Sequence, residues 1–378
     1  MKSFVHLNPV EIHFGTGSFE HAGVIAKRYG KKALVVTGRR SMRETGATDE
    51  LLSRLNNEGI DAEVFDRVEP NLSYTTVDEG AELAKKCDMV IGLGGGSAMD
   101  AAKAIAIAAF EQKPISSFFS GETPSEAIPV IEIPTTAGTG SEADRYFVLT
   151  DPRTGEKHGR GYRCSYPVAS MVDPMLMETM PRRLTASTGI DAFFHGLESY
   201  VSRMSTPIGE LYAGEAMKLI VGNLEDACRN DKDARENMAL ASTLAGMAID
   251  VGRTTLLHAL EHPLSGHLDV PHGEGLAALS IAYMEFTYPA CPEKFAYIAS
   301  LLGEDVAGAG AEEAAKKSID GMRKFLERVG MNIRLKDMGA DEDMIDTFVK
   351  DALKSHLLDI TPRPASAADM REIYLKSL

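Results

Sequence analysis

The sequence has few cysteines. Cys87, Cys164, Cys228 and Cys291 lie far apart along the 378 residues, and no CxxC pair occurs. This spacing excludes a metal cluster held by thiolates. Cysteine used so sparsely is typical of a reducing compartment, so we expect a cytoplasmic protein.

Long apolar runs and clusters of basic residues are also absent. No stretch of about 18 apolar residues occurs that would span a bilayer, and the opening MKSFVHLNPVEIHFGTG lacks the apolar core of a signal peptide. The formal net charge is −15, and no block rich in Lys and Arg appears. Nucleic acids and anionic membrane surfaces require such blocks, so we expect neither as the main partner.

The chain instead contains two patterns in succession. In the first part, short apolar runs alternate with helix-like segments; the runs are 32–38, 62–68, 88–96, 128–136 and 168–174, and the helix-like segments are 48–59, 76–87 and 97–112. This alternation predicts a parallel, Rossmann-like sheet with right-handed crossovers. After about Met180 the spacing becomes helical, as in 209–230, 236–252, 312–330 and 341–358. We predict an α/β domain of residues 1–178 and an all-α domain of residues 179–378.

A glycine loop lies between a predicted strand and a predicted helix. Gly94, Gly95, Gly96 and Ser97 occur in VIGLGGGSAMDAAKAIA, where free N–H groups at the helix start favour a phosphate. The loop matches neither a Walker A motif, since Lys103 lies two turns into the helix, nor the pattern GxGxxG. The alternative is a turn that serves only strand–helix packing.

A second loop, IPTTAGTGSEAD, follows the next strand. Its hydroxyl groups come from Thr135, Thr136, Thr139 and Ser141. Because loops at the carboxyl ends of neighbouring parallel strands face one crevice, the two loops together predict a ligand with several phosphate and sugar groups, such as a dinucleotide. A hydroxyl-rich loop can equally be a turn that satisfies its own hydrogen bonds.

The first predicted strand ends in Gly38, Arg39, Arg40 and Ser41. A nicotinamide cofactor without a 2′-phosphate usually pairs its ribose with an acidic side chain at this point, whereas a 2′-phosphate pairs with Arg. The sequence therefore favours NADP(H) over NAD(H). The alternative is that both arginines are ordinary surface residues.

Four of the ten histidines occur in the segment HALEHPLSGHLDVPHGEG. His258 and His262 share a helix face at a spacing of four, and His272 precedes Gly at a predicted helix start. Asp191 and His195 repeat the same spacing upstream. One carboxylate and several imidazoles without sulfur suit Fe(II) or Zn(II). Without further support, these side chains are equally compatible with an ordinary buried or surface role.

Six segments in order identify a family resemblance: GGGSAMDAAKAIA, IPTTAGTGSE, DPMLMETMP, LTASTGIDAFFHGLESYVS, HALEHPLSGHLDVPHG and PRPASAADMREIYLKSL. Over essentially its whole length, the sequence resembles the iron-containing (group III) alcohol dehydrogenase family. The resemblance implies a dehydroquinate synthase-like architecture of two domains, with a metal, Fe(II) or else zinc, meeting the nicotinamide between them.

The resemblance also implies roles for individual residues. The family's metal ligands fall on Asp191, His195, His258 and His272, and His262 falls on a histidine near the metal that serves as a candidate proton relay. The implied cofactor contacts are Gly94, Gly95, Gly96, Ser97, Thr135, Thr136 and Thr139 in the two loops, with Asn71, Lys157 and Leu184 elsewhere. Glu198, three residues after His195, could orient an imidazole or simply face outward.

The sequence departs from the family pattern at three positions. Asp144 replaces a hydroxyl near the cofactor, Gly38 stands where NAD-preferring members carry an acidic residue, and His267 is an additional histidine that we expect in a surface loop. The implied function is hydride transfer between NAD(P)(H) and a small primary alcohol, aldehyde or diol, by a homodimer or larger homo-oligomer. The alternatives are a glycerol or polyol-phosphate dehydrogenase of the same superfamily and a nucleotide-binding protein without catalysis.

Overall fold

The computed structural model describes residues 3–378, which divide into two compact units. The first unit is Leu7–Met180, and the second is Pro181–Leu378 together with residues 3–6. The division after Met180 lies two residues beyond the expected boundary, and residues 3–6 group with the second unit rather than the first.

The first unit is built on a six-stranded sheet in the order β1-β8-β5-β4-β2-β3, with every neighbouring pair parallel. Its strands are β1 (Glu11–Phe14), β2 (Lys32–Gly38), β3 (Asp61–Val68), β4 (Met89–Gly94), β5 (Val130–Pro134) and β8 (Ala169–Val172). The expected parallel sheet is confirmed. The edge strand β1 was not predicted, because its four residues are only partly buried and carry no continuous apolar run.

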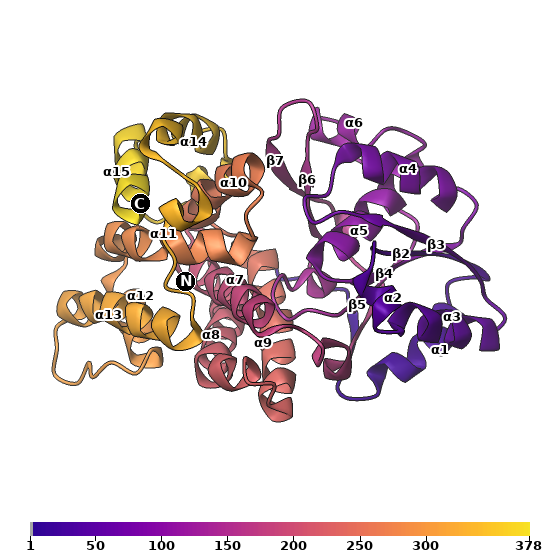
Figure 1. The fold of residues 1–378 in the computed structure, drawn as a ribbon, viewed down its shortest axis with the longest axis horizontal. Helices are drawn as coiled ribbons and strands as arrows, with labels where there is room; N and C mark the ends of the chain where they lie inside the picture. The colour runs from indigo at the N-terminus through magenta and orange to yellow at the C-terminus, as the bar shows by residue number, and fades with distance from the viewer. Residues whose placement is uncertain (1–2) are drawn as a thin grey trace. The chain divides into compact units, whose positions relative to one another are not determined.

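Helices cover both faces of this sheet (Figure 1). The helices of this unit are α1 (Ala22–Ala26), α2 (Ser41–Glu44), α3 (Ala47–Asn57), α4 (Tyr74–Ala84), α5 (Gly96–Glu111) and α6 (Ser116–Phe119). Along β2, Leu34 and Val36 pack in the core beneath α4 and α5, whereas Ala33 and Val35 pack in the core beneath α1 and α3. This alternation explains why both faces of the strand are apolar, as in a sheet covered on each side.

An antiparallel hairpin of β6 (Tyr146–Thr150) and β7 (Lys157–Gly161) lies outside the main sheet. Residues 158–161 form most of β7, and a short 3₁₀ turn, Arg163–Ser165, follows them. Phe147 and Leu149 are buried, whereas β7 carries Lys157, His158 and Arg160 with little apolar surface. The hairpin could not be predicted because only one of its two strands has an apolar face.

The second unit is helical throughout. Its helices are α7 (Arg182–Val201), α8 (Pro207–Ala227), α9 (Lys232–Gly252), α10 (Leu256–Leu268), α11 (His272–Thr287), α12 (Pro292–Leu301), α13 (Ala311–Val329), α14 (Ile345–Ala352) and α15 (Ala367–Ser377). Helix α7 packs against α8, α9 and α11 and is buried on nearly all sides. Its polar residues are therefore held inside the unit.

The predicted helix at 341–358 is wrong in its extent. Only α14 is α-helical there, and short 3₁₀ turns precede and follow it. The Asp341 side chain accepts a hydrogen bond from the N–H of Met344, and that of Ser355 accepts one from the N–H of Leu357. Each side chain starts a new turn, which divides the apolar periodicity into three pieces.

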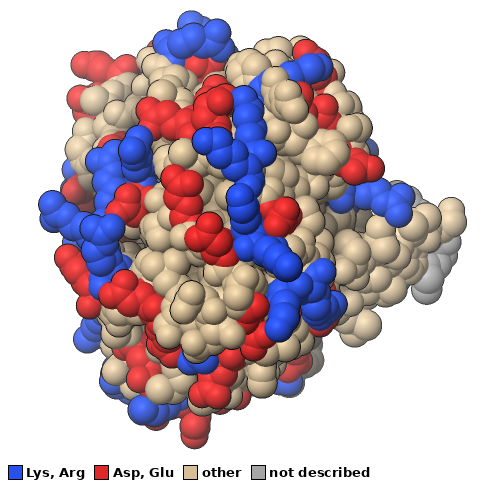
Figure 2. Space-filling model, turned by 90° about the vertical axis from the view of Figure 1, so that its right-hand side faces the viewer, with Lys and Arg blue, Asp and Glu red and all other residues tan. Residues whose placement is uncertain are grey.

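Charges of both signs are mixed on the face that Figure 2 shows, where Lys and Arg side chains form a narrow band with acidic side chains beside it. Among residues 3–378, no helix is long and apolar enough to cross a membrane. The four cysteines are free thiols.

Candidate metal centre and nucleotide-binding loops

The two upstream members of the predicted metal set lie on the buried helix α7. Asp191 and His195 are one turn apart, with 4% and 6% of their surfaces exposed. The imidazole Nε2 of His195 lies 3.3 Å from Oδ1 of Asp191. A carboxylate and an imidazole at this depth need a charged partner, because burial penalises an unpaired charge.

The two downstream members approach the same oxygen from separate helices. His258 lies in the first turn of α10, and His272 is the first residue of α11. Their Nε2 atoms are 3.6 Å and 3.5 Å from Oδ1 of Asp191. The structure thus brings all four predicted ligands together around one carboxylate oxygen within the helical unit.

The donor atoms of this cluster fit a divalent cation. Among the described residues, Oδ1 of Asp191 and Nε2 of His258 are buried and accept or donate no hydrogen bond. With the proton of His258 on Nδ1, both atoms offer an electron pair toward each other, so a cation between them would satisfy both. Three imidazoles with one carboxylate suit Fe(II) or Zn(II) better than Ca²⁺ or Mg²⁺, which prefer oxygen ligands.

Burial and charge shift the ionisation of these groups in opposite directions. Burial raises the pKa of Asp191, but the imidazoles of His195 and His272 outweigh it and hold the pKa well below its usual range. Burial lowers the pKa of His195 to about 4. For His258, burial lowers the pKa, but the carboxylates of Glu198 and Asp191 outweigh it and raise the pKa to about 10.

The other histidines of the segment have different surroundings. His262 lies one turn after His258 on α10, and its ring centroid is 6.3 Å from that of His258 and 5.9 Å from that of His272. It therefore lies beside the cluster, and one of its ring nitrogens is within 4.8 Å of donor atoms of His272 and Glu261. His267 lies in the last turn of α10 rather than in a loop, and its partly exposed Nε2 is 2.8 Å from Oδ2 of Asp351.

Two buried glutamates contact the far side of the ligand imidazoles. Glu198 accepts a hydrogen bond from Nδ1 of His258, so it faces inward rather than outward. Glu261 contacts Nδ1 of His272 and was missed from the sequence. Each glutamate follows a ligand histidine by three residues, in HGLE and HALE, and this repeated spacing was the available signal.

The glycine loop joins β4 to α5 in the α/β unit. Gly94 has a φ of +152°, which a side chain would strain, and Gly95 precedes the first turn of α5. A Cβ on Gly96 would lie 2.5 Å from Cγ2 of Thr139, and one on Gly95 would lie 3.3 Å from Thr136. The two predicted loops therefore touch, and the glycines leave backbone N–H groups at the helix start.

The other residues near this edge extend the same surface. Ser97 donates a hydrogen bond of 2.8 Å to the carbonyl of Pro70, which places Asn71 in the loop beside it. The N–H of Thr135 donates to the carbonyl of Gly94. These contacts join the loops that follow β3, β4 and β5 at the carboxyl edge of one parallel sheet.

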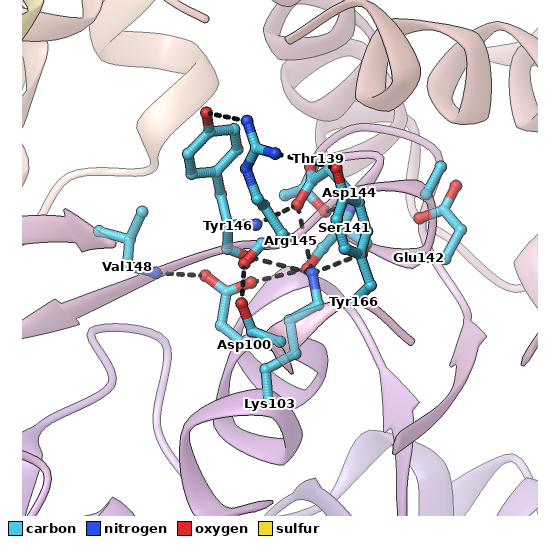
Figure 3. A network of polar contacts seen from close by, with 12 residues as sticks. Asp100, Lys103, Thr139, Ser141, Glu142, Asp144, Arg145, Tyr146, Val148 and Tyr166 are labelled. Carbon is cyan, nitrogen blue, oxygen red and sulfur yellow. Dashed lines mark hydrogen bonds and ion pairs between the residues drawn. The ribbon is translucent and has the colours of Figure 1, made fainter. Parts of the chain in front are cut away.

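Below the second loop lies a buried polar network around Lys103 (Figure 3). The ammonium group of Lys103 donates to the carbonyl and hydroxyl oxygens of Ser141 at 2.6 and 2.8 Å, to Tyr146 O at 2.9 Å and to Asp144 Oδ1 at 3.2 Å. Asp100 accepts from the hydroxyl of Ser141 at 2.8 Å. The network fastens the loop to α5, and Asp144 is part of it.

The remaining predicted cofactor residues are more dispersed. Gly38 ends β2, and Arg39, Arg40 and Ser41 are exposed at the start of α2, at the carboxyl edge of the sheet. Lys157 begins β7 in the hairpin. Leu184 lies in the first turn of α7, in the helical unit.

Family models match both units of the chain. The model described as "Iron-containing alcohol dehydrogenase" matches residues 9–174, and "Fe-containing alcohol dehydrogenase family, C-terminal" matches residues 185–378. The sequence is 37% identical to a 1,3-propanediol dehydrogenase of Citrobacter freundii, over 99% of this chain and 98% of the relative. It is 34% identical to an NAD-dependent methanol dehydrogenase of Bacillus methanolicus, over 96% and 97%.

The fold is likewise similar to solved structures. An iron-containing alcohol dehydrogenase from Thermotoga maritima superposes with a TM-score of 0.89 at 35% identity, and the match covers 100% of this chain and 99% of that one. The order of motifs, the two-unit fold and the family matches agree. The chain therefore belongs to the iron-containing alcohol dehydrogenase family, and it is an NAD(P)-dependent alcohol dehydrogenase.

Proposed function

We propose that the protein reduces small aldehydes, and oxidises the corresponding primary alcohols or diols, with a preference for NADP(H). We further propose that Asp191, His195, His258 and His272 hold Fe(II) or Zn(II). The observation that carries this proposal is the convergence of three Nε2 atoms to within 3.6 Å of one buried oxygen of Asp191. A metal there would act as a Lewis acid on the substrate oxygen, while the nicotinamide exchanges the hydride.

The chain's own residues divide the remaining tasks. Asp191 provides the negative charge at the centre, and the three imidazoles approach it from α7, α10 and α11. His262 lies beside two of these imidazoles, where it can receive the alcohol proton and pass it to solvent.

The glycine loop and the second loop, IPTTAGTGSEAD, hold the dinucleotide. The first turn of α5 presents N–H groups to the pyrophosphate, and Thr136 and Thr139 lie against the glycines. Asn71 lies in the adjoining loop, and Lys157 and Leu184 are proposed to serve the nicotinamide end.

The preference for NADPH is proposed from the end of β2. Gly38 supplies no carboxylate for the ribose hydroxyls, and the exposed Arg39, Arg40 and Ser41 supply donors for a 2′-phosphate. The methanol dehydrogenase relative is described as NAD-dependent, so the choice of cofactor varies among related chains and must be measured here.

The substrate is proposed to be small and uncharged. Arg253 is the clearest basic residue near the histidines in the sequence, and a substrate phosphate would call for more than one. The 1,3-propanediol dehydrogenase relative makes diols a natural first test. Assembly as a homodimer or larger oligomer, and a cytoplasmic location, stay predictions.

A substrate screen on defined metal forms tests the proposal. Protein freed of metal and reloaded with Fe(II) or Zn(II) should reduce propanal, butanal, lactaldehyde or 3-hydroxypropanal with NADPH at a higher kcat/KM than with NADH. His262→Ala should keep the metal and turn over more slowly, by about 10²-fold or more if it is the proton relay. Turnover by a verified metal-free His272→Ala protein at the wild-type rate would overturn the proposal.

A further inference from the structure

The unit His-x-Leu-Glu occurs twice among the predicted ligands. It spans His195–Glu198 on α7 and His258–Glu261 on α10. Both glutamates are fully buried, with 0% of their surface exposed. A buried carboxylate is costly unless hydrogen bonds or opposite charge compensate it, so the partners of each one indicate its role.

Glu198 links α7 to α10. Its Oε1 accepts from the N–H of Thr255 at 3.0 Å, from the hydroxyl of Thr255 and from the N–H of Leu257 at 2.8 Å. Its Oε2 accepts from Nδ1 of His258. One carboxylate therefore caps the first turn of α10 and holds the imidazole that this turn carries.

Glu261 repeats the arrangement one helix further along the chain. Its Oε2 contacts Nδ1 of His272 at the start of α11, and its Oε1 accepts from the hydroxyl of Ser265. Gly275 leaves room for this carboxylate, because a Cβ there would lie 2.8 Å from Oε1 of Glu261. Helices α7 and α10 thus each provide a carboxylate that contacts the imidazole on the next ligand-bearing helix.

His195 differs from the other two imidazoles. Within residues 3–378, its buried Nδ1 has no hydrogen-bond partner. His258 and His272, in contrast, each have Nδ1 against a carboxylate while Nε2 faces Asp191. A proton kept on Nδ1 leaves Nε2 with a free electron pair, which is the form of imidazole that binds a metal.

We propose that Glu198 and Glu261 are positioning residues that fix His258 and His272 in the orientation and tautomer for metal binding through Nε2. The inference rests on the proposed metal site and deepens it. Because the two carboxylates act in series from α7 to α10 to α11, they also fix the spacing of the three helices that carry the ligands. Each carboxylate contacts Nδ1, the ring nitrogen that does not face Asp191, so we expect its effect on metal binding.

The test concentrates on Glu261, because Glu198 also caps a helix. Metal-free wild type, E261Q and E261A are titrated with Zn²⁺ in competition with a chromophoric chelator. The dissociation constant should rise by roughly 10-fold in E261Q, which keeps an oxygen beside Nδ1 and removes the charge, and by up to about 100-fold in E261A. In the Co²⁺-loaded proteins, the visible d–d bands should shift in the same order, which a change in fold stability alone would not produce.

Glu274→Gln is the matched control. Glu274 is a buried carboxylate on the same helix as His272, but it pairs with Arg183 at 2.6 and 2.7 Å and not with an imidazole. The Zn²⁺ affinity of the Glu274→Gln protein should stay within about twofold of wild type, because the carboxylate that is lost pairs with Arg183 rather than with a ligand imidazole. If E261A does not fold, E261Q carries the test, because it keeps the shape of the side chain.

The outcomes separate this inference from the proposed function. Wild type that binds no Zn²⁺ tightly, or His272→Ala that binds it as tightly as wild type, would overturn the metal site itself. In the other case, wild type binds Zn²⁺ and His272→Ala does not. If E261Q and E261A then match wild type in Zn²⁺ affinity and Co²⁺ spectrum, the positioning role is overturned and the metal site is left intact.

Discussion

Replacement of Lys103 by Met removes the buried ammonium group from the network under the second loop and puts an apolar side chain of similar size in its place. Lys103 is fully buried, and four oxygen atoms accept from its ammonium group within 3.2 Å. After the substitution, the buried carboxylate of Asp144 loses the ammonium at 3.2 Å and keeps the N–H of Tyr146, which donates to it at 2.6 Å. A buried ion pair is thereby broken on one side.

The expected loss is large for a single substitution. Removal of one partner from a buried ion pair costs about 3–5 kcal/mol. For a domain of this size, 1 kcal/mol shifts Tm by about 2–4 °C, so the α/β unit should melt roughly 6–20 °C lower. Asp144→Asn, which keeps an acceptor oxygen and removes only the charge, should lose less, about 1–3 kcal/mol.

Scanning calorimetry of the whole chain measures this change, with Lys113→Met as the control. Lys113 lies just beyond the end of α5 and pairs with Glu122, but both side chains are about half exposed, so its loss should leave Tm unchanged. The KM for NADPH should also rise in Lys103→Met, because Thr139 lies in the released loop. A Tm within 1–2 °C of the Lys113→Met protein would refute the reasoning.

Three further substitutions test other parts of the account. Gly38→Asp should shift cofactor preference from NADPH towards NADH by about 10-fold or more in the ratio of kcat/KM values. The new carboxylate fits, because the nearest atom to a Cβ on Gly38 is 3.9 Å away. An unchanged ratio would show that Gly38 does not set the cofactor preference. Gly96→Ala should raise the KM for cofactor several-fold, because its Cβ would lie 2.5 Å from Thr139. If calorimetry shows that the variant binds NADPH as tightly as wild type, the close contact of the two loops is contradicted. Burial raises the pKa of Glu132 well above its usual 4.5, and the nearby Lys103 only partly offsets this. A carboxyl group whose pKa is raised in the fold stabilises the protein below pH 4.5, and this stabilisation is lost as the pH rises. The Tm of Glu132→Gln should therefore exceed that of wild type by more at pH 8 than at pH 5. A Tm difference independent of pH would contradict the buried, neutral carboxyl.

The parallel sheet and the helical unit could be predicted because their signals are strong and local. Buried strands such as β2 and β4 are continuous apolar runs closed by glycine, and α8, α9 and α13 keep one period for five turns or more. The hairpin of β6 and β7 has no such signal, because Lys157 to Gly161 bury little apolar surface. The break around α14 depends on two capping side chains whose hydrogen bonds compete with helix propagation.

The convergence of Asp191 with the three imidazoles could be predicted from the sequence, but the carboxylates that contact those imidazoles could not. The spacing of Asp191 and His195, and of His258 and His262, identifies helix faces, and the family resemblance selects the ligands. Nothing in the spacing reveals that Glu261 reaches His272 on another helix, because that contact depends on how α10 and α11 pack. Asp144 illustrates the same limit: its role is set by Lys103, which is 41 residues away in the sequence.

The metal content of purified protein, measured by mass spectrometry alongside NADPH-dependent propanal reduction, tests the central claim most directly. Wild type should carry about one Fe or Zn per chain, and Asp191→Ala and His272→Ala should each lose both the metal and the activity. Stoichiometric metal together with undiminished turnover in either variant would contradict the claim that these helices hold the catalytic ion.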